Sequence, residues 1–187
     1  MEKFSNIKKS RRKRKSDEPI WSNNWLSVKE ENKYTYIEER DSVVCIPILM
    51  ERNEIILRVE DIPPFNIRDN RKEHLTVISG TIEDTERPVD TLRRELTEEA
   101  GLILRDNMPL TIIKELFVSK SSNKKFHLSI LPLYETDYQE TKAKGDGSIY
   151  EKNSRAVKVN INNINPLLPS DIITELLLNY VQDFLKT

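Results

Sequence analysis

A 23-residue segment from Gly80 to Leu102, GTIEDTERPVDTLRRELTEEAGL, constrains the fold of this 187-residue chain more than any other stretch. Pro88 suits the first position of a helix, because its missing N–H would be unpaired there anyway, and Gly101 suits the left-handed residue that follows a helix. Four apolar residues recur between them at helical spacing: Val89, Leu92, Leu96 and Ala100. The segment therefore predicts a helix over residues 88–100 whose apolar stripe faces a core.

The predicted helix gathers acidic side chains at its end. Glu95, Glu98 and Glu99 project from one face, where like charges repel and the helix dipole disfavours negative charge. A divalent ion such as Mg²⁺ or Mn²⁺ would resolve the repulsion, because these ions prefer carboxylate oxygens. The alternative is a solvated acidic face paired with Arg93 and Arg94.

The spacing of the whole segment resembles the Nudix box. The matching positions are Gly80, Glu86, Arg94, Glu95, Leu96, Glu98, Glu99, Gly101 and Leu102. The resemblance implies a hydrolase that cleaves the pyrophosphate bond of a nucleoside diphosphate linked to another group, with Mg²⁺ or Mn²⁺ as cofactor.

The resemblance also implies a role for each matching residue. Glu95, Glu98 and Glu99 would bind the catalytic ions, and Gly80 would let its backbone approach the metal. Arg94 would hold a neighbouring carboxylate in place. Glu86 would support that network by ion pairing. Glu95 and Glu98 are also candidates for the general base.

Apolar runs on both sides of the box predict strands. They cover residues 21–28, 34–40, 41–50, 53–60, 74–80, 111–119, 126–134 and 156–161. The strands at 41–50 and 53–60 should pair across a tight turn at 51–53, and those at 111–119 and 126–134 should form a hairpin. An amphipathic helix capped by Ser170 closes the chain. We expect an α/β fold, the Nudix α/β/α sandwich with a mixed sheet.

Charge divides the chain into parts. Residues 1–16 carry eight basic side chains and one acidic one, a net charge of +7, whereas the other 171 residues carry a net −8. We expect a flexible basic tail at 1–19, disordered alone, an N-terminal strand segment at 20–40 and a Nudix domain at 41–187. The tail could serve as a nuclear address, contact nucleic acid, dock to an acidic protein surface, or only aid solubility.

Composition favours a cytoplasmic protein, with a nuclear location as the alternative suggested by the tail. No apolar run approaches the ~20 residues that span a bilayer, so we expect no membrane association. The single cysteine, Cys45, lies in the apolar run SVVCIPILM. It is expected to be a buried strand residue in a reducing compartment rather than a nucleophile.

A weaker resemblance over about residues 21–185 is to the ADP-ribose and ADP-sugar pyrophosphatase branch. It implies that the substrate yields AMP and a sugar phosphate, and that the enzyme is a homodimer, since related enzymes exchange N-terminal strands. The chain departs from that branch at residues 58–70, at Ile78-Ser79 and at Ser119-Lys120-Ser121, which leaves the shape of the pocket open.

The same branch suggests further site residues. Glu151, in the loop GDGSIYEKNS, matches a catalytic base, with Glu140 behind it; the alternative is a solvated loop acid. Trp21 or Trp25 could stack on adenine or instead cover the sheet or a dimer contact. Arg58 could contact the pyrophosphate or be a surface strand residue.

Two other functions stay open from the sequence. One is a Nudix enzyme acting on nucleoside triphosphates, dinucleoside polyphosphates or capped RNA. The other is a catalytically silent nucleotide-binding or interaction protein.

Overall fold

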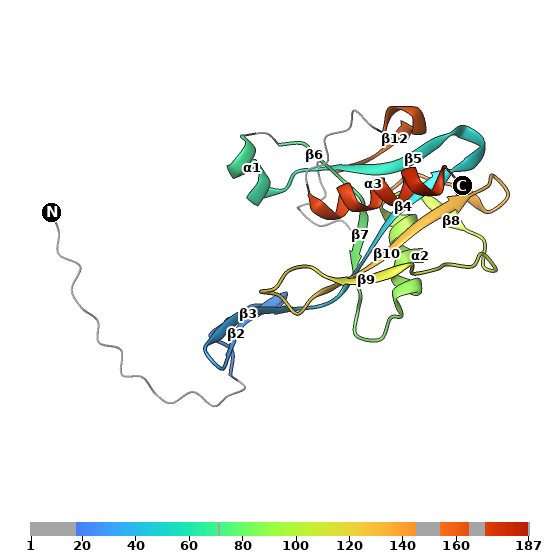
Figure 1. Ribbon diagram of the computed structural model, residues 1–187. Coiled ribbons are helices and arrows are strands. Elements are labelled where there is room, and N and C mark those ends of the chain that lie inside the picture. Colours follow the sequence, from blue (N-terminus) through green and yellow to red (C-terminus); the bar gives the residue numbers. More distant parts are fainter. Residues whose placement is uncertain (1–17, 71, 145–153, 165–170, 187) are drawn as a thin grey trace, which may run out of the picture.

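A mixed β-sheet forms the centre of the computed structural model, which describes residues 18–70, 72–144, 154–164 and 171–186 (Figure 1). Its strand order is β12-β5-β4-β10-β9, with β6 paired to β5 and β7 to β4. The strands are β4 (Ser42–Leu49), β5 (Glu54–Glu60), β6 (His74–Thr76), β7 (Ile78–Thr81), β9 (Lys114–Phe117), β10 (Lys125–Leu133) and β12 (Arg155–Asn160). The β4–β10 pair is parallel and the other pairs are antiparallel, so the sheet is mixed, as expected.

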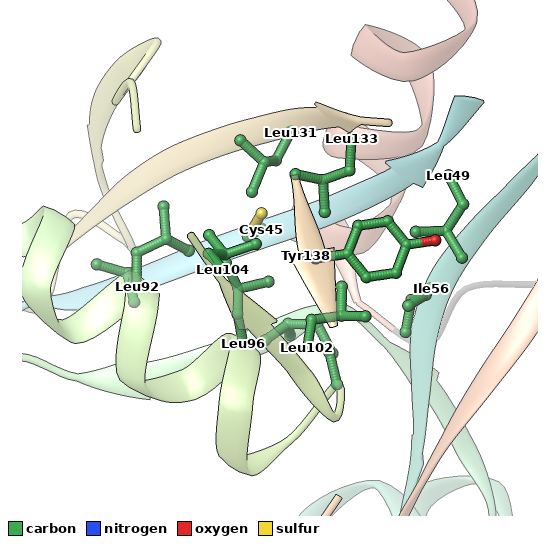
Figure 2. Close-up of a cluster of buried hydrophobic side chains, with 13 residues drawn as sticks. Cys45, Leu49, Ile56, Leu92, Leu96, Leu102, Leu104, Leu131, Leu133 and Tyr138 are labelled. Atoms are coloured by element: carbon green, nitrogen blue, oxygen red, sulfur yellow. The ribbon is translucent and has the colours of Figure 1, made fainter. Parts of the chain in front are cut away.

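Helices pack on the two faces of this sheet. Every residue of β4 is buried, and alternate side chains enter two separate cores, because neighbouring residues of a strand point to opposite faces. Val43 and Cys45 pack with the helix α2 (Pro88–Glu98), whereas Val44 and Ile46 pack with α3 (Ile172–Phe184). Figure 2 shows the core on the α2 side. This is the predicted α/β/α sandwich.

The N-terminal strands form a separate antiparallel sheet of β1 (Trp21–Ser22), β2 (Leu26–Glu31) and β3 (Tyr34–Glu39). Asn32 and Lys33 turn the chain between β2 and β3 with φ of 49° and 68°. The hairpin extends away from the sandwich beside the β9–β10 connection (Figure 1). Its attachment includes the Tyr34 hydroxyl, which donates to the carbonyl oxygen of Lys120 at 2.6 Å.

Several strand predictions are confirmed. Strands β4 and β5 pair antiparallel across the short helix η1 (Met50–Arg52), and β9 and β10 form an antiparallel hairpin. The single strand expected at 74–80 is instead two, because β6 pairs with β5 whereas β7 pairs with β4. The expected strand at 111–119 is shorter, since only Lys114–Phe117 is extended in the ladder.

Four short elements were absent from the predicted pattern. They are α1 (Pro63–Asp69), η3 (Ile161–Asn163), and β8 (Leu102–Leu104) paired with β11 (Tyr138–Glu140). Short strands such as β8 carry too few residues to show a period.

Both predicted helix boundaries need adjustment. Helix α2 ends at Glu98 rather than Ala100, although Gly101 does adopt the predicted left-handed conformation with φ of 67°. The cap of α3 is Asp171 and not Ser170, which lies outside the described residues. Because the helix begins at Ile172, the carboxylate of Asp171 is the one that accepts from the N–H groups of Ile173 and Thr174, both at 2.9 Å.

Cys45 is fully buried, as predicted. Burial raises the pKa of its thiol to about 12, so the thiolate that a nucleophile needs is scarce at neutral pH. No helix in the described part of the chain is long and apolar enough to cross a membrane.

Candidate active site

Helix α2 carries acidic residues to the edge of a cavity of about 750 Å³. Leu92 and Leu96 are fully buried against the sheet and fix the rotation of the helix. As a result, Glu95 and Glu99 line the cavity while remaining only 7% and 6% exposed. Glu98 is half-buried beside them.

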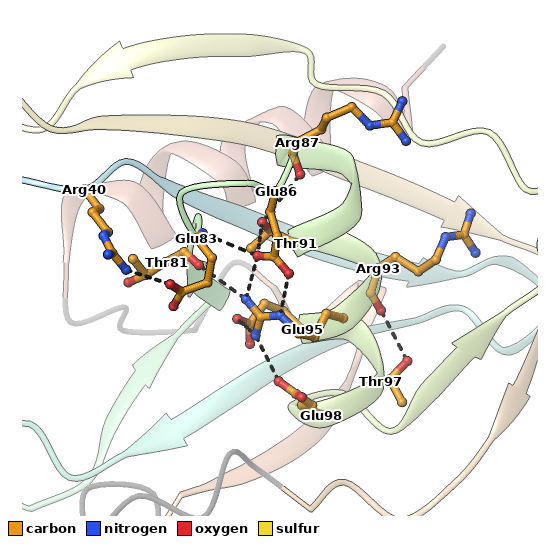
Figure 3. A network of polar contacts seen from close by, with 11 residues as sticks. Arg40, Thr81, Glu83, Glu86, Arg87, Thr91, Arg93, Glu95, Thr97 and Glu98 are labelled. Carbon is orange, nitrogen blue, oxygen red and sulfur yellow. Dashed lines mark hydrogen bonds and ion pairs between the residues drawn. The ribbon is translucent and has the colours of Figure 1, made fainter.

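Arg94 joins the carboxylates of this region into one network. Three of these carboxylates, Glu86, Glu95 and Glu98, are labelled in Figure 3. Arg94 Nη1 donates to Glu95 Oε1 at 2.6 Å and to Glu98 Oε2 at 3.0 Å. On its other side, Nε donates to Glu86 Oε1 at 3.1 Å and Nη2 to Glu86 Oε2 at 3.2 Å. Glu86 also accepts from the hydroxyl of Thr91 at 2.8 Å. Arg94 and Glu86 thus belong to one ion-paired network, and the supporting roles expected for them stay predictions.

The acidic face is not simply solvated. Arg93, one of the two partners expected for that alternative, donates instead to the carbonyl oxygens of Arg105 and Met108, at 2.9 and 3.0 Å. Arg94 does pair with Glu95 and Glu98, but Glu95 and Glu99 are buried. Because Glu95 and Glu99 are buried and line the cavity, this acidic face is not an ordinary solvent-exposed helix surface.

Gly80 on β7 makes room for Glu95. A β-carbon at this position would lie 1.8 Å from Glu95 Oε1. The carboxylate of Glu95 lies against the backbone of β7 at this position, so a residue with a β-carbon would displace it.

Arg58 on β5 is only 3% exposed, which excludes the surface-residue alternative. Its Nη1 lies 2.7 Å from Glu99 Oε1, and its Nε lies 3.1 Å from Glu60 Oε1. Glu60 Oε2 accepts from the hydroxyl of Thr76 at 2.9 Å. Arg58 thus links Glu99 to a second carboxylate in the same cavity, and its contact with pyrophosphate stays a prediction.

The charge state of Glu99 reflects its surroundings. Burial raises the pKa of its carboxyl to about 9, against the opposing effects of the Arg58 guanidinium and of the Ser79 N–H, which donates to Glu99 Oε2 at 2.9 Å. A cation brought close to Glu99 would favour its charged form.

The donor atoms of the site are of the kind that a hard divalent ion prefers. Glu95, Glu99 and Gly80 meet in one cavity, and carboxylate and carbonyl oxygens are the ligands that Mg²⁺ and Mn²⁺ prefer. Among the described residues, no three His, Cys, Asp or Glu side chains are gathered closely enough to hold an ion. In this structure Arg94 pairs with Glu95 and Arg58 pairs with Glu99. A metal ion bound by these carboxylates would therefore replace contacts that the two guanidinium groups now make.

The tryptophans differ in their relation to the cavity. Trp25 lines it while staying 78% exposed, whereas Trp21, 54% exposed, is not among the lining residues. Stacking on adenine by either ring stays a prediction.

Glu151 lies outside the described residues. The described chain before it ends beside α2, where the Lys144 N–H donates to the carbonyl oxygen of Glu98 at 3.0 Å. Glu140, the second loop candidate, forms ion pairs with Arg52 and Lys158.

Several lining residues were missed from the sequence, among them Glu60, Phe65 and Lys124. Glu60 stands two residues after Arg58 on β5, so the period of a strand could have placed it on the same face. Phe65 lies on the unexpected helix α1, and nothing local marked Lys124.

Comparisons with known proteins found one matching family model and a solved structure of similar fold. Residues 38–153 match the family model described as NUDIX domain. A solved structure described as "Crystal structure of ADP compounds hydrolase" is similar in fold, with a TM-score of 0.65 and 20% identity over 90% of this chain and 91% of that one. The sequence has no match among the curated proteins.

Proposed function

Because this chain belongs to the Nudix family of pyrophosphohydrolases, we propose that it hydrolyses ADP-ribose or an ADP-sugar to AMP and a sugar phosphate with the help of Mg²⁺ or Mn²⁺. The observation that carries the proposal is the carboxylate network around Arg94, set at a cavity of about 750 Å³. That volume suits a nucleotide-sized ligand. The fold similarity to an ADP compounds hydrolase supports the choice of ADP-linked substrates.

In this proposal the chain's own residues position the reacting groups. Glu95, Glu98 and Glu99 would hold the metal, and Arg94 keeps Glu95 and Glu98 oriented by donating to both. A bound divalent ion would neutralise pyrophosphate oxygens and lower the pKa of a water. For the group that takes a proton from that water we propose Glu98, which is half-buried and held by Arg94, with Glu95 and the loop residue Glu151 as alternatives.

The proposed assembly is a homodimer that pairs through the N-terminal sheet. Trp21, Trp25 and Tyr34 are each more than half exposed on that sheet and its turns, and large exposed aromatic residues are typical of interfaces. The proposed location is the cytoplasm, with the nucleus as the alternative.

The first experiment incubates the purified full chain with millimolar Mg²⁺ or Mn²⁺ and a substrate panel. The panel contains ADP-ribose, ADP-glucose, diadenosine polyphosphates, nucleoside triphosphates and capped RNA. We expect the highest kcat/KM for ADP-ribose or ADP-glucose, with AMP as a product. Preference for triphosphates or capped RNA would overturn the substrate assignment, and no cleavage of any substrate would overturn the enzymatic one.

A charge-removing variant tests the role of the box. Glu98→Gln should lower kcat by about 10²–10⁴-fold, the range for loss of a positioned acid–base group, while the melting temperature stays close to that of the wild type. Glu175→Gln on the exposed side of α3 is the matched control and should keep full activity. Near wild-type turnover in Glu98→Gln would contradict the assignment.

A further inference from the structure

The cavity has an apolar part that the carboxylates do not explain. Its apolar lining comes from α1, from the β9–β10 hairpin and from the start of α3, and includes Ile62, Phe65, Val118, Phe126, Ile172 and Ile173. The carboxylates and arginine belong to α2 and the neighbouring strands. One cavity therefore joins a charged part to an apolar part whose aromatic residues include Phe65 and Phe126.

Helix α1 brings Phe65 to this cavity, although the helix is not anchored in the hydrophobic core of the protein. None of its residues is buried, and Ile67 is 87% exposed. In Figure 1 the helix stands at the edge of the sandwich beside β6. A short helix with so little buried surface needs specific contacts to keep its position.

Buried His74 supplies two such contacts. It lies on β6 with no exposed surface, and its ring meets the ring of Phe65 at an angle of 76° with centroids 5.3 Å apart. Its Nε2 lies 2.9 Å from Asn66 Oδ1. Because Asn66 uses its Nδ2 to donate to Asp61, the amide oxygen faces His74, and His74 Nε2 carries the proton that is donated. Consecutive residues of α1 are thus fixed to one rigid strand residue.

We propose that α1 forms a cap on the apolar part of the cavity, that Phe65 contacts the base of the nucleotide, and that His74 and Asn66 are positioning residues for Phe65. The inference rests on the proposed function. A nucleoside diphosphate derivative has a charged pyrophosphate and a flat ring of low polarity, and the two parts of the cavity match these two chemistries. An aromatic side chain can stack on the face of any base, so this contact supplies affinity without selecting one particular purine.

The test compares two ligands that differ by the base. Binding of AMP and of ribose 5-phosphate is measured by calorimetry in the presence of Mg²⁺. Phe65→Ala should raise the Kd for AMP about 10-fold, since the aromatic ring that contacts the base is lost, and should leave the Kd for ribose 5-phosphate unchanged. Phe65→Tyr keeps the ring and should bind AMP like the wild type.

Ile67→Ala is the matched control, because it removes an exposed apolar side chain from the same helix. It should change neither Kd. If Phe65→Ala binds AMP as tightly as Ile67→Ala does, or weakens both ligands equally, the assignment of Phe65 to the base is overturned.

The positioning role has its own readout. Asn66→Ala should raise KM for ADP-ribose several-fold with kcat within about twofold, because it loosens the base contact without touching the reacting atoms. An equal fall in kcat would show a general structural effect and overturn this role. Since AMP binding needs no turnover, a protein that cleaves nothing but loses AMP affinity in Phe65→Ala would refute the proposed activity and retain the base subsite.

Discussion

Arg94 and Arg58 each join carboxylates from different parts of the chain. Arg94 connects Glu86, before α2, to Glu95 and Glu98, and Arg58 connects Glu60 on β5 to Glu99. Buried carboxylates without such partners would be strongly unfavourable, because the loss of hydration is not offset. At the residue scale, these two guanidinium groups allow an acidic site to exist in the folded protein.

Gly80→Ala tests how closely Glu95 depends on the strand beside it. The added methyl group would stand 1.8 Å from Glu95 Oε1, so the flexible carboxylate must move while the backbone can stay. We expect kcat to fall by about 100-fold, as for other small displacements of a reacting constellation, with little change in melting temperature. In a Glu95→Gln background the same substitution should add no further loss; an additive loss would contradict this explanation.

Glu86→Gln should show a pH-dependent loss of stability. Hydrogen bonds from Arg94, and then from Thr91, lower the pKa of the Glu86 carboxyl from 4.5 to about 2. Its contribution to folding is therefore fully present above pH 4.5 and is lost as pH falls through 2. Denaturant unfolding should find the variant about 1 kcal/mol less stable at pH 7, with the difference shrinking as pH falls and vanishing below pH 2. A constant difference across this range would argue against the ion pair as the cause.

At the element scale, helices α2 and α3 use their ends differently. The last turn of α2 carries Glu95 and Glu98, and Glu99 follows as the C-cap, although negative charge is unfavourable there. The first turn of α3 is stabilised by Asp171, and its Ile172 and Ile173 line the same cavity. The residues that each helix brings to the cavity therefore depend on where α2 ends and where α3 begins.

Asp171→Ala should lower stability by about 1 kcal/mol, because two N–H groups and the Thr174 hydroxyl lose their acceptor. For a domain of this size the melting temperature should fall by about 2–4 °C. Asp171→Ser retains a capping oxygen and should recover most of the loss in a thermal scan. A serine variant as unstable as the alanine variant would point to a role other than capping.

At the scale of the whole molecule, opposite charges are separated along the chain. Residues 1–16 carry a net +7 and the remainder a net −8. The described part already contains the sandwich and the cavity, so substrate cleavage should not require the first 16 residues.

Deletion of residues 1–16 should leave kcat/KM for ADP-ribose unchanged and remove any salt-sensitive binding to nucleic acid. The physical reason is that contacts to phosphate groups release counterions, so such binding weakens steeply as salt rises. Titration of labelled RNA or DNA at 50 and 200 mM salt measures it. Nucleic-acid binding that persists in the truncated protein would place the contact on the folded body instead.

The layered fold was expected from the resemblance to the Nudix family, whereas the sequence by itself determined the helix of the box and the identity of its acidic residues. Helical spacing, Pro88 and Gly101 act within a few residues, so local physics fixes them. The burial of Cys45 followed in the same way from a continuous apolar run.

Only the tertiary structure decided which partner each site residue has. Arg58 reaches Glu99 from β5, His74 holds Phe65 from β6, and Arg93 turns away from the acidic face to distant carbonyl oxygens. Such contacts join residues far apart in the chain, and whether an arginine is exposed or buried depends on how the sheet and helices pack. A local pattern specifies the side chains of a site, but packing selects the cation that each carboxylate meets.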